Sequence, residues 1–393
     1  MNSLYIRDPQ ALTSLVTEIR GVSRLAVDTE FVRERQYYPQ LEIVQIATED
    51  VEAVIDYRAL GTLEPFPKLL NDPRTLKVLH AGYQDLEIFF NLTGAVPAPL
   101  FDTQVAAAMV GLGAQVGYAR LVETLLGKSI RKSETLTDWA KRPLSKAQIE
   151  YALNDVRYLL DLHEKLKRRL EEMGRDEWLE DEWEAMTDPD SYRRVHPNEA
   201  YRHVQGVNRL RGHELPILRE LAAWREREGI RRDRVPSHIV RDNILAELAR
   251  RAPETIEGLH EIRGLHHREI ERNGKEILAA IQRGKEVPRK EWPRLPERST
   301  LSDQESSLVV LMQAWLRARA DAMNIAANYL ATSSELRALV TASPEERMTF
   351  DVLRGWRRRL VGADLLALLE GQASLAWEPE TERLKLINKE GAR

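Results

Sequence analysis

The sequence predicts an α/β domain with a mixed sheet, followed by two copies of a small all-helical domain. Two observations support this prediction. The first 170–190 residues alternate short apolar runs, typical of buried strands, with amphipathic helical stretches. From about residue 208 onward we find only helical patterns, and they repeat once. A chain of 393 residues has room for two or three domains.

The strands of the α/β domain are predicted from apolar runs bounded by turn residues. The first three runs are joined by short connections, which favour an antiparallel meander. The fourth leads through a turn at Gly82 into a helix that covers Asp85 to Phe90. The predicted strands cover Arg24–Asp28, Ile43–Ala47, Ala53–Asp56 and Lys77–His80.

Two helices of this domain have recognisable ends. Leu121–Leu126 reads as a helix that stops at Gly127, a residue typical of the position after a helix. Ser145 and Gln148 have the spacing of a capping box, so a helix should begin there and continue to about Leu162.

The helical half contains a repeat. Each copy has a Trp in its first helix, an Arg-Gly pair later, and a final G-x-x-[IL]-L-A-x-[IL] helix. A repeat this long indicates two copies of one domain rather than a solenoid. The matching positions are Trp224 and Trp315, Arg263-Gly264 and Arg354-Gly355, and Gly274 and Gly362.

The repeat, together with polar and proline-rich stretches, defines the predicted domain boundaries. Pro189 and Pro197 lie in a polar linker, and Val287–Thr300 is proline-rich and basic. The predicted division is an α/β domain over 1–187, a linker over 188–207, helical domains over 208–288 and 300–375, and a C-terminal tail over 376–393.

Composition excludes several classes of site. The chain has no cysteine, which rules out disulfides, thiolate catalysis and cysteine-ligated zinc or iron–sulfur centres. The N-terminal residues lack the pattern of a signal peptide, and the apolar run Val105–Ala114 is too short to span a bilayer. We therefore expect a soluble, cytoplasmic protein without membrane contact. The net charge of −4 does not favour nucleic acid, although local basic patches are what binding requires.

A pair of carboxylates ends the first predicted strand. Asp28 and Glu30 are two residues apart, so both side chains point to the same face of a strand. Two like charges are costly to bury together unless a cation lies between them, and hard divalent cations take oxygen ligands. The simpler alternative is that this D-x-E faces solvent.

Two further acids stand in comparable places. Asp85 occupies the first turn of a helix, where an acid also stabilises the helix dipole, and Asp155 lies one turn after Tyr151 on a helical face. Four carboxylates converging from separate elements would form a site for two divalent cations about 3.5–4 Å apart, which can hydrolyse a phosphodiester by in-line displacement. The tyrosine hydroxyl would hold the attacking water in line.

Three segments that carry these residues resemble the DEDDy group of exonucleases, and within it the ribonuclease D family. The repeated helical units resemble HRDC domains, which bind nucleic acid. The matching segments are VDTEFVRERQYYPQLEIVQIA from Val27, HAGYQDLEIFF from His80 and KSETLTDWAKRPLSKAQIEYALNDVRYL from Lys132.

The resemblance implies a ribonuclease-H-like fold and a 3′→5′ exoribonuclease that releases 5′-monophosphates. It implies Mg²⁺ or Mn²⁺ as cofactor, and transfer-RNA precursors and other small structured RNAs as substrates. Carried over to this sequence, Asp28, Glu30, Asp85 and Asp155 would hold the metals, and Tyr151 would position the water. A monomer is expected. A 3′→5′ exonuclease acting on DNA and a nucleic-acid-binding scaffold with an inactive nuclease fold remain the alternatives.

Other residues are candidates for contact with RNA. Phe31 and Tyr83 would stack on a terminal base, although Phe31 fits a core position equally well. Asp102 is a possible fifth ligand, but we expect a helix cap there, and for His80 a hydrogen-bonded histidine rather than a ligand. The candidates for phosphate contacts are Lys132, Arg142, Arg357 and Arg358. For Lys132 and Arg142 the alternative is a loop exposed to solvent.

Overall fold

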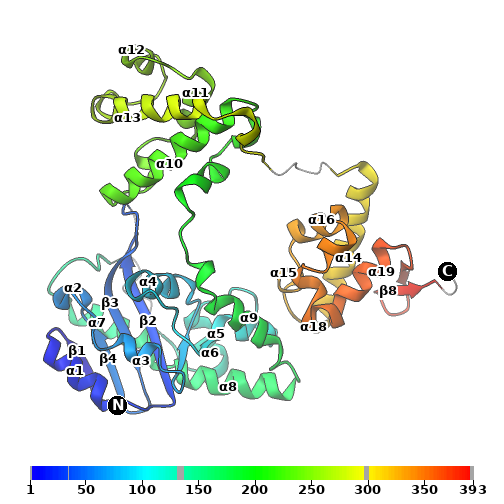
Figure 1. Ribbon diagram of the computed structural model, residues 1–393. Coiled ribbons are helices and arrows are strands. Elements are labelled where there is room, and N and C mark those ends of the chain that lie inside the picture. Colours follow the sequence, from blue (N-terminus) through cyan, green and yellow to red (C-terminus); the bar gives the residue numbers. More distant parts are fainter. Residues whose placement is uncertain (1, 34, 131–136, 296–300, 390–393) are drawn as a thin grey trace. The chain divides into compact units, whose positions relative to one another are not determined.

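The structure, a computed structural model, describes residues 2–33, 35–130, 137–295 and 301–389 (Figure 1). The chain divides into two units. The first, here called the sheet unit, comprises Met1–Glu30, Glu42–Ser191 and Ser299–Arg393. The second, the helical unit, comprises Phe31–Leu41 and Tyr192–Arg298. Each unit is described by itself.

A six-stranded mixed sheet forms the centre of the sheet unit, with the strand order β1-β4-β3-β2-β5-β6. The pairs β1–β4, β2–β5 and β5–β6 are parallel, whereas β3 and β4 are antiparallel, as the predicted meander requires. The strands are β1 (Asn2–Ile6), β2 (Arg24–Val32), β3 (Gln40–Ala47), β4 (Val51–Ile55), β5 (Leu76–Leu79) and β6 (Leu100–Asp102).

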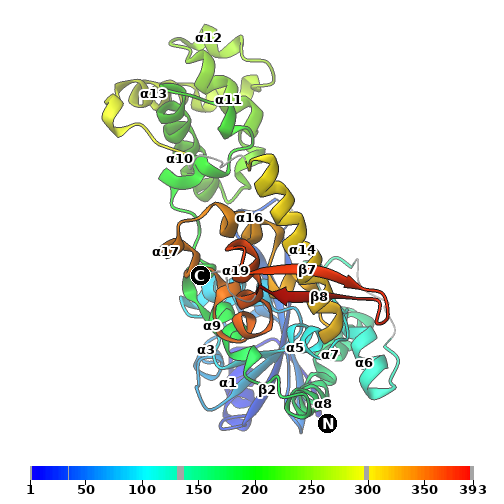
Figure 2. The same ribbon diagram turned by 90° about the vertical axis from the view of Figure 1, so that its right-hand side faces the viewer.

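Helices cover both faces of this sheet. Figure 2 shows α1 and α3 on one side and α5, α7 and α8 on the other. The second group buries Ala26, Ala47 and Val78 of the sheet in one apolar cluster with Val156 and Leu159. The helices are α1 (Pro9–Glu18), α2 (Tyr57–Leu60), α3 (Pro67–Leu70), α4 (Tyr83–Thr93), α5 (Thr103–Met109), α6 (Tyr118–Leu126), α7 (Lys146–Arg157), α8 (Leu159–Glu172) and α9 (Trp178–Thr187).

Helix ends follow the sequence signals closely. Ser145 accepts a hydrogen bond from the backbone N–H of Gln148, and the Gln148 side chain accepts one from Ser145, so the predicted capping box is confirmed. Gly127 has φ +66° and ends α6, also as predicted. The prediction missed β1 and α1, although Asp8 and Pro9 are an N-cap and a first-turn proline.

The C-terminal helices pack on the same core as the sheet. Trp356 stacks on Trp178 of α9 with ring centroids 4.6 Å apart, and both rings are buried. Arg175 donates hydrogen bonds to the carbonyl oxygens of Met109 and Met323, at 2.6 and 2.9 Å. The C-terminal helices are α14 (Asp303–Met323), α15 (Ala327–Leu330), α16 (Ser333–Thr341), α17 (Pro344–Arg347), α18 (Gly355–Arg357) and α19 (Ala363–Leu369), with a π-helical turn over Arg358–Gly362.

A β-hairpin follows these helices, and it corrects the prediction of purely helical structure after residue 208 and of a simple tail over 376–393. Strands β7 (Ala373–Glu378) and β8 (Arg383–Asn388) pair antiparallel. Leu375, Leu384 and Leu386 pack against the core, so the hairpin is part of the sheet unit.

The helical unit has its own apolar core, formed around α10 (Glu214–Arg232) and α13 (His267–Glu286). Helices α11 (Asp242–Arg251) and α12 (Ile256–His260) complete it. The segment Phe31–Leu41 also belongs to this unit. Tyr37 is buried in this unit. Its hydroxyl donates a hydrogen bond to Glu226, and its backbone N–H donates one to Asp233 Oδ1 at 3.0 Å.

The two helical regions repeat the same backbone features. The long first helix ends in each at a left-handed residue, Asp233 (φ +48°) or Asn324 (φ +52°). The glycine of each Arg-Gly pair also has positive φ, +89° at Gly264 and +44° at Gly355, a conformation that glycine adopts readily. These features support the repeat. Within the described residues, none of the helices combines the length and apolar character that crossing a bilayer requires.

Candidate active site

Strand β2 carries Asp28 and Glu30 on one face, with Thr29 between them on the other. The strand continues to Val32, so the two acids lie within it; the prediction that the strand ends at them is wrong. Both acids are half-buried. β2 lies between β3 and β5 in the sheet, which restrains the backbone that carries the two acids.

Asp85 and Asp155 come from two helices, as predicted. Asp85 lies in the first turn of α4 and is buried, and Asp155 lies in the last turn of α7 and is half-buried. The four acids are neighbours in space: besides burial, the charges of Asp85, Asp155 and Glu30 raise the pKa of Asp28 well above its usual range. The structure therefore brings the four predicted acids together.

The other three acids of this cluster also hold their protons more tightly than usual. Burial, with the charges of Asp155 and Asp85, raises the pKa of Glu30 to about 8. Burial raises the pKa of Asp85 to about 7, although a hydrogen bond from Thr29 acts in the opposite direction. Burial alone raises the pKa of Asp155 to about 7. A cluster of acids that resists ionisation near neutral pH is a typical functional-site signal.

Thr29 is a residue of the site that the sequence analysis did not single out. Its hydroxyl donates a hydrogen bond to Asp85 Oδ1, so the middle residue of D-x-E holds the acid of the next motif. Its position between two candidate ligands was the signal available. A hydroxyl there fixes one carboxylate oxygen of Asp85 and leaves the other for a further partner.

Tyr151 lies one turn before Asp155 on α7 and is half-buried. Its ring packs against the apolar cluster formed by Ile43, Val54 and Trp139, with its centroid 6.1 Å from that of the Trp139 ring. The packing fixes the ring, which a residue that positions a water needs.

The donor chemistry of this cluster fits hard divalent cations. All four side chains supply carboxylate oxygens, the ligands that Mg²⁺ and Mn²⁺ prefer. Ions at the centre would offset the mutual repulsion that helps to raise the pKa values of Asp28 and Glu30. Within the described parts of the chain, no group of three Asp, Glu or His side chains is already arranged to hold a metal ion.

Asp102 and His80 have structural roles, as expected. Asp102 caps α5 by accepting hydrogen bonds from the backbone N–H groups of Gln104 and Val105, at 2.8 and 3.1 Å. The same carboxylate accepts from the N–H of Gly82 at 2.8 Å and so holds the turn before α4. His80 Nδ1 is 2.9 Å from the Thr103 hydroxyl.

The two aromatic candidates for base stacking are both accessible. Phe31 directly follows Glu30 and is partly exposed, which is compatible with either stacking or packing. Tyr83 opens α4, two residues before Asp85, and is 49% exposed. Its hydroxyl donates to the carbonyl oxygen of Ser191 at 3.0 Å, so the ring is held in place.

Arg142 has a different role from the predicted phosphate contact. Its guanidinium makes two hydrogen bonds to the Asp56 carboxylate, Nε to Oδ2 at 2.8 Å and Nη2 to Oδ1 at 2.7 Å. Burial raises the pKa of Asp56, but hydrogen bonds from Arg142 and Tyr5 lower it by more than burial raises it. The pKa of Asp56 is therefore below its usual value. Arg142 therefore fixes the loop before α7. Lys132 lies outside the described residues.

Arg357 likewise has an internal role in place of the predicted one. Its Nε donates to the carbonyl oxygen of Tyr329 at 2.8 Å, its Nη2 donates to Glu182, and its guanidinium lies 4.4 Å from the Trp356 ring centroid. These contacts join α18 to α9. Arg358 is exposed.

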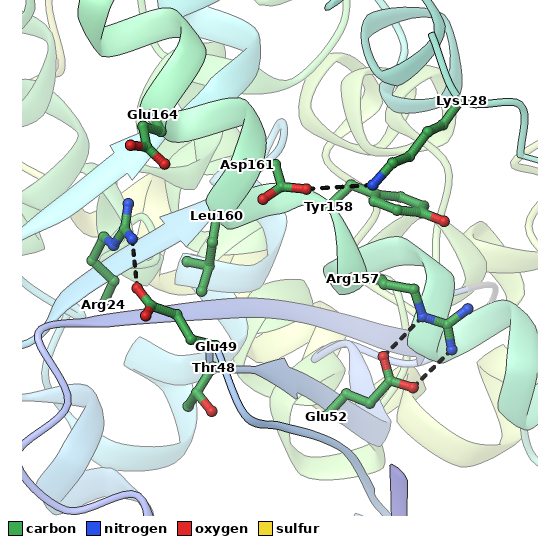
Figure 3. A pocket seen from close by; sticks show the side chains of 10 residues that line it. All are labelled: Arg24, Thr48, Glu49, Glu52, Lys128, Arg157, Tyr158, Leu160, Asp161 and Glu164. Carbon is green, nitrogen blue, oxygen red and sulfur yellow. Dashed lines mark hydrogen bonds and ion pairs between the residues drawn. The ribbon is translucent and has the colours of Figure 1, made fainter. Parts of the chain in front are cut away.

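An open cavity of about 750 Å³ lies at the start of β2, and Figure 3 shows the side chains that line it. Its three cations pair with carboxylates in the same cavity. Arg24 lies 2.6 Å from Glu49, and Arg157 lies 2.7 Å from Glu52. The third, Lys128, lies 3.6 Å from Asp161. Because the charges are already paired, the cavity offers little attraction to a phosphate.

Family models match two parts of the chain. One described as a 3′-5′ exonuclease matches residues 4–171, which include all five candidate catalytic residues. One described as an HRDC domain matches residues 214–281, in the helical unit. Both matches agree with the predicted order of an exonuclease domain followed by HRDC-like structure.

Relatives and solved structures extend these matches to nearly the whole chain. A ribonuclease D from Sphingobium indicum is 39% identical over 385 residues, 97% of each chain, and one from Acidiphilium cryptum is 40% identical over 377 residues, 95% of this chain and 94% of that one. The crystal structure of Escherichia coli RNase D superposes with a TM-score of 0.86 at 32% identity, over 94% of this chain and 99% of that one. The protein belongs to the ribonuclease D family of 3′→5′ exoribonucleases.

Proposed function

We propose that Asp28, Glu30, Asp85 and Asp155 hold two divalent cations and that Tyr151 positions the attacking water in this exoribonuclease. The observation that supports this best is the clustering of four acids: burial raises the pKa of each of them, and repulsion from other acids of the cluster raises it further at Asp28 and Glu30. A cluster kept for structure alone would destabilise the fold without a benefit.

The chain's own residues have separable tasks in this proposal. Bound Mg²⁺ or Mn²⁺ would supply an acidified water and neutralise charge on the phosphodiester. The carboxylates fix where the scissile phosphate lies, and Thr29 keeps Asp85 oriented. The Tyr151 hydroxyl hydrogen-bonds the water that attacks in line with the leaving 3′-oxygen. The product is a nucleoside 5′-monophosphate and an RNA one nucleotide shorter.

The proposed substrates are the 3′ ends of transfer-RNA precursors and other small structured RNAs. The E. coli enzyme is described as an exoribonuclease involved in structured RNA processing, and the HRDC match over 214–281 supports a nucleic-acid-binding role for the helical unit. Phe31 and Tyr83 flank the acids in sequence and could stack on the terminal base. A DNA substrate remains the alternative, because the same carboxylates would cleave either backbone.

The domain division also remains a proposal. The repeated helix ends and glycine conformations support two HRDC-like copies, over 208–288 and 300–375. The first copy is the main candidate RNA-binding module, because the second packs through Trp356 and Arg357 against α9. Arg358 is the remaining exposed candidate there. We further propose that the protein is monomeric and cytoplasmic.

The experiment is a time course on a 5′-labelled RNA with a 3′ extension and on its DNA counterpart, with Mg²⁺, Mn²⁺ or EDTA. We expect a metal-dependent ladder that shortens RNA from the 3′ end and leaves DNA largely intact. Asp28→Asn should bind the RNA in a filter assay and produce no ladder. Near-normal shortening by that variant would contradict the assignment of the site, and equal shortening of DNA would favour the alternative substrate.

A further inference from the structure

Gln45, in the middle of β3, is fully buried, with 0% of its surface exposed. Neither Nε2 nor Oε1 has a hydrogen-bond partner among the residues that the structure describes. A buried amide without partners is costly, and native proteins leave few such groups unexplained. An apolar side chain of the same size would fill the space without this cost, so the buried amide indicates a polar partner beyond the contacts described.

The strand geometry places Gln45 on the same face of the sheet as the carboxylates. Side chains alternate along β3, so Gln45 shares a face with Ile43 and Ala47. Ile43 packs in one apolar cluster with Ala152 and Leu153 of α7, the helix that carries Tyr151 and Asp155.

The neighbouring strand gives the same result. Ala47 lies in one apolar cluster with Ala26, and β3 is the direct neighbour of β2. Asp28 and Glu30 follow Ala26 at two-residue steps, so they share its face. Gln45 therefore lies on the strand beside these acids, beneath the helix that supplies Asp155.

Glu52 and Lys77, two other buried polar side chains of the sheet, do have partners, and Glu42 of β3 lacks one among the described residues only at Oε2, because its Oε1 accepts from Arg58. Glu52 accepts two hydrogen bonds from Arg157, and Lys77 donates to the carbonyl oxygens of Asp72, Thr75 and Ala98. Gln45 differs from these side chains because both atoms of its amide lack a partner in the part of the chain that the structure describes.

We propose that Gln45 is a positioning residue of the exonuclease site, whose amide hydrogen-bonds the ordered water beside the Asp28 and Glu30 carboxylates. Its N–H donates to that water or to a carboxylate oxygen, and its carbonyl oxygen accepts from the water. The amide thereby fixes the orientation of the acids toward the ions that they bind. This inference rests on the proposed site.

The test compares Gln45→Met with Ile46→Met. Both substitutions keep the approximate volume of a fully buried residue of β3, and Ile46 points to the opposite face. Melting temperatures are measured in EDTA and across a Mg²⁺ titration, and kcat and KM are measured on a 3′-extended RNA. Gln45→Val serves as a second variant where methionine overpacks the site.

For Gln45→Met we expect an unchanged or higher melting temperature in EDTA, because an unpaired amide is removed. The Mg²⁺ concentration that gives half of the thermal stabilisation should rise ~10-fold or more, the usual scale for a residue that orients metal ligands. The kcat should fall by a similar factor with KM for RNA nearly unchanged. Ile46→Met should keep the wild-type metal response.

Two results for Gln45→Met would overturn the inference. One is an unchanged Mg²⁺ response with an unchanged kcat. The other is a lower melting temperature in EDTA with an unchanged Mg²⁺ response, which would assign Gln45 to packing alone. Asp28→Asn separates this inference from the proposed site. If Asp28→Asn loses the Mg²⁺ response and Gln45→Met keeps it, only the role of Gln45 fails. If Asp28→Asn keeps the response, the proposed site itself fails.

Discussion

Replacing Asp155 with Asn should stabilise the metal-free protein at high pH while abolishing its activity. Burial raises the pKa of this carboxyl from 3.8 to about 7 in the folded state. The folded protein therefore keeps a proton that the unfolded chain releases, and the stability of the metal-free wild type falls as the pH rises from about 4 to about 7. Asn carries no such proton, so the variant lacks this loss.

The magnitude follows from the size of the shift. Each pKa unit corresponds to about 1.4 kcal/mol, so a shift of about three units sets an upper limit of roughly 4 kcal/mol above pH 7. Asp155 is half-buried and its charge is partly solvated. We therefore expect Asp155→Asn to raise the free energy of unfolding by about 2 kcal/mol at pH 8 in EDTA, with nearly equal values for both proteins at pH 4.5.

Urea denaturation in EDTA at both pH values measures this difference. Glu164→Gln, which removes an exposed carboxylate from α8, is the matched control and should leave the pH dependence unchanged. Added Mg²⁺ should stabilise the wild type at pH 8 and have little effect on Asp155→Asn. An Asp155→Asn protein that is less stable than wild type at pH 8 in EDTA would refute the electrostatic account of the cluster.

Three further variants test other parts of the structure. Tyr151→Phe should keep the Mg²⁺-dependent thermal stabilisation and lower kcat by about 10²-fold, and loss of the metal response would contradict a role limited to the water. Trp356→Ala should lower the free energy of unfolding by about 3–5 kcal/mol, because Trp356 and Trp178 share one core. Circular dichroism and tryptophan fluorescence should both follow a single unfolding transition. A separate early transition would show that the C-terminal helices fold independently. Arg142→Met should cost about 3–5 kcal/mol in urea denaturation, because Asp56 would stay buried and charged without its guanidinium partner, and a change in RNA affinity without loss of stability would restore the predicted phosphate contact.

The parts of the site that the sequence predicts well depend on local rules. The capping box at Ser145 and Gln148 fixes where α7 begins, and with it the face that Tyr151 and Asp155 share. The two-residue spacing of Asp28 and Glu30 fixes their common face on β2. These relations need only the periodicity of one element.

What the sequence does not reveal depends on contacts between distant segments. The basic stretch around Arg142 looks like a surface loop until Asp56, which is 86 residues away in the chain, is seen beside it. The Trp178–Trp356 stack likewise joins residues that no local pattern connects. The C-terminal hairpin did have a local signal, the alternation of apolar residues in 373–388, but a repeat of helical domains suggested that helices would continue.

The most direct test of the proposed site is to locate Mn²⁺ by anomalous scattering in crystals of the protein grown with Mn²⁺. We predict two anomalous peaks, bonded to carboxylate oxygens of Asp28, Glu30, Asp85 and Asp155, with a water on one ion within hydrogen-bond distance of the Tyr151 hydroxyl. Peaks at other residues, or no peak at this cluster in crystals of an active preparation, would contradict the assignment.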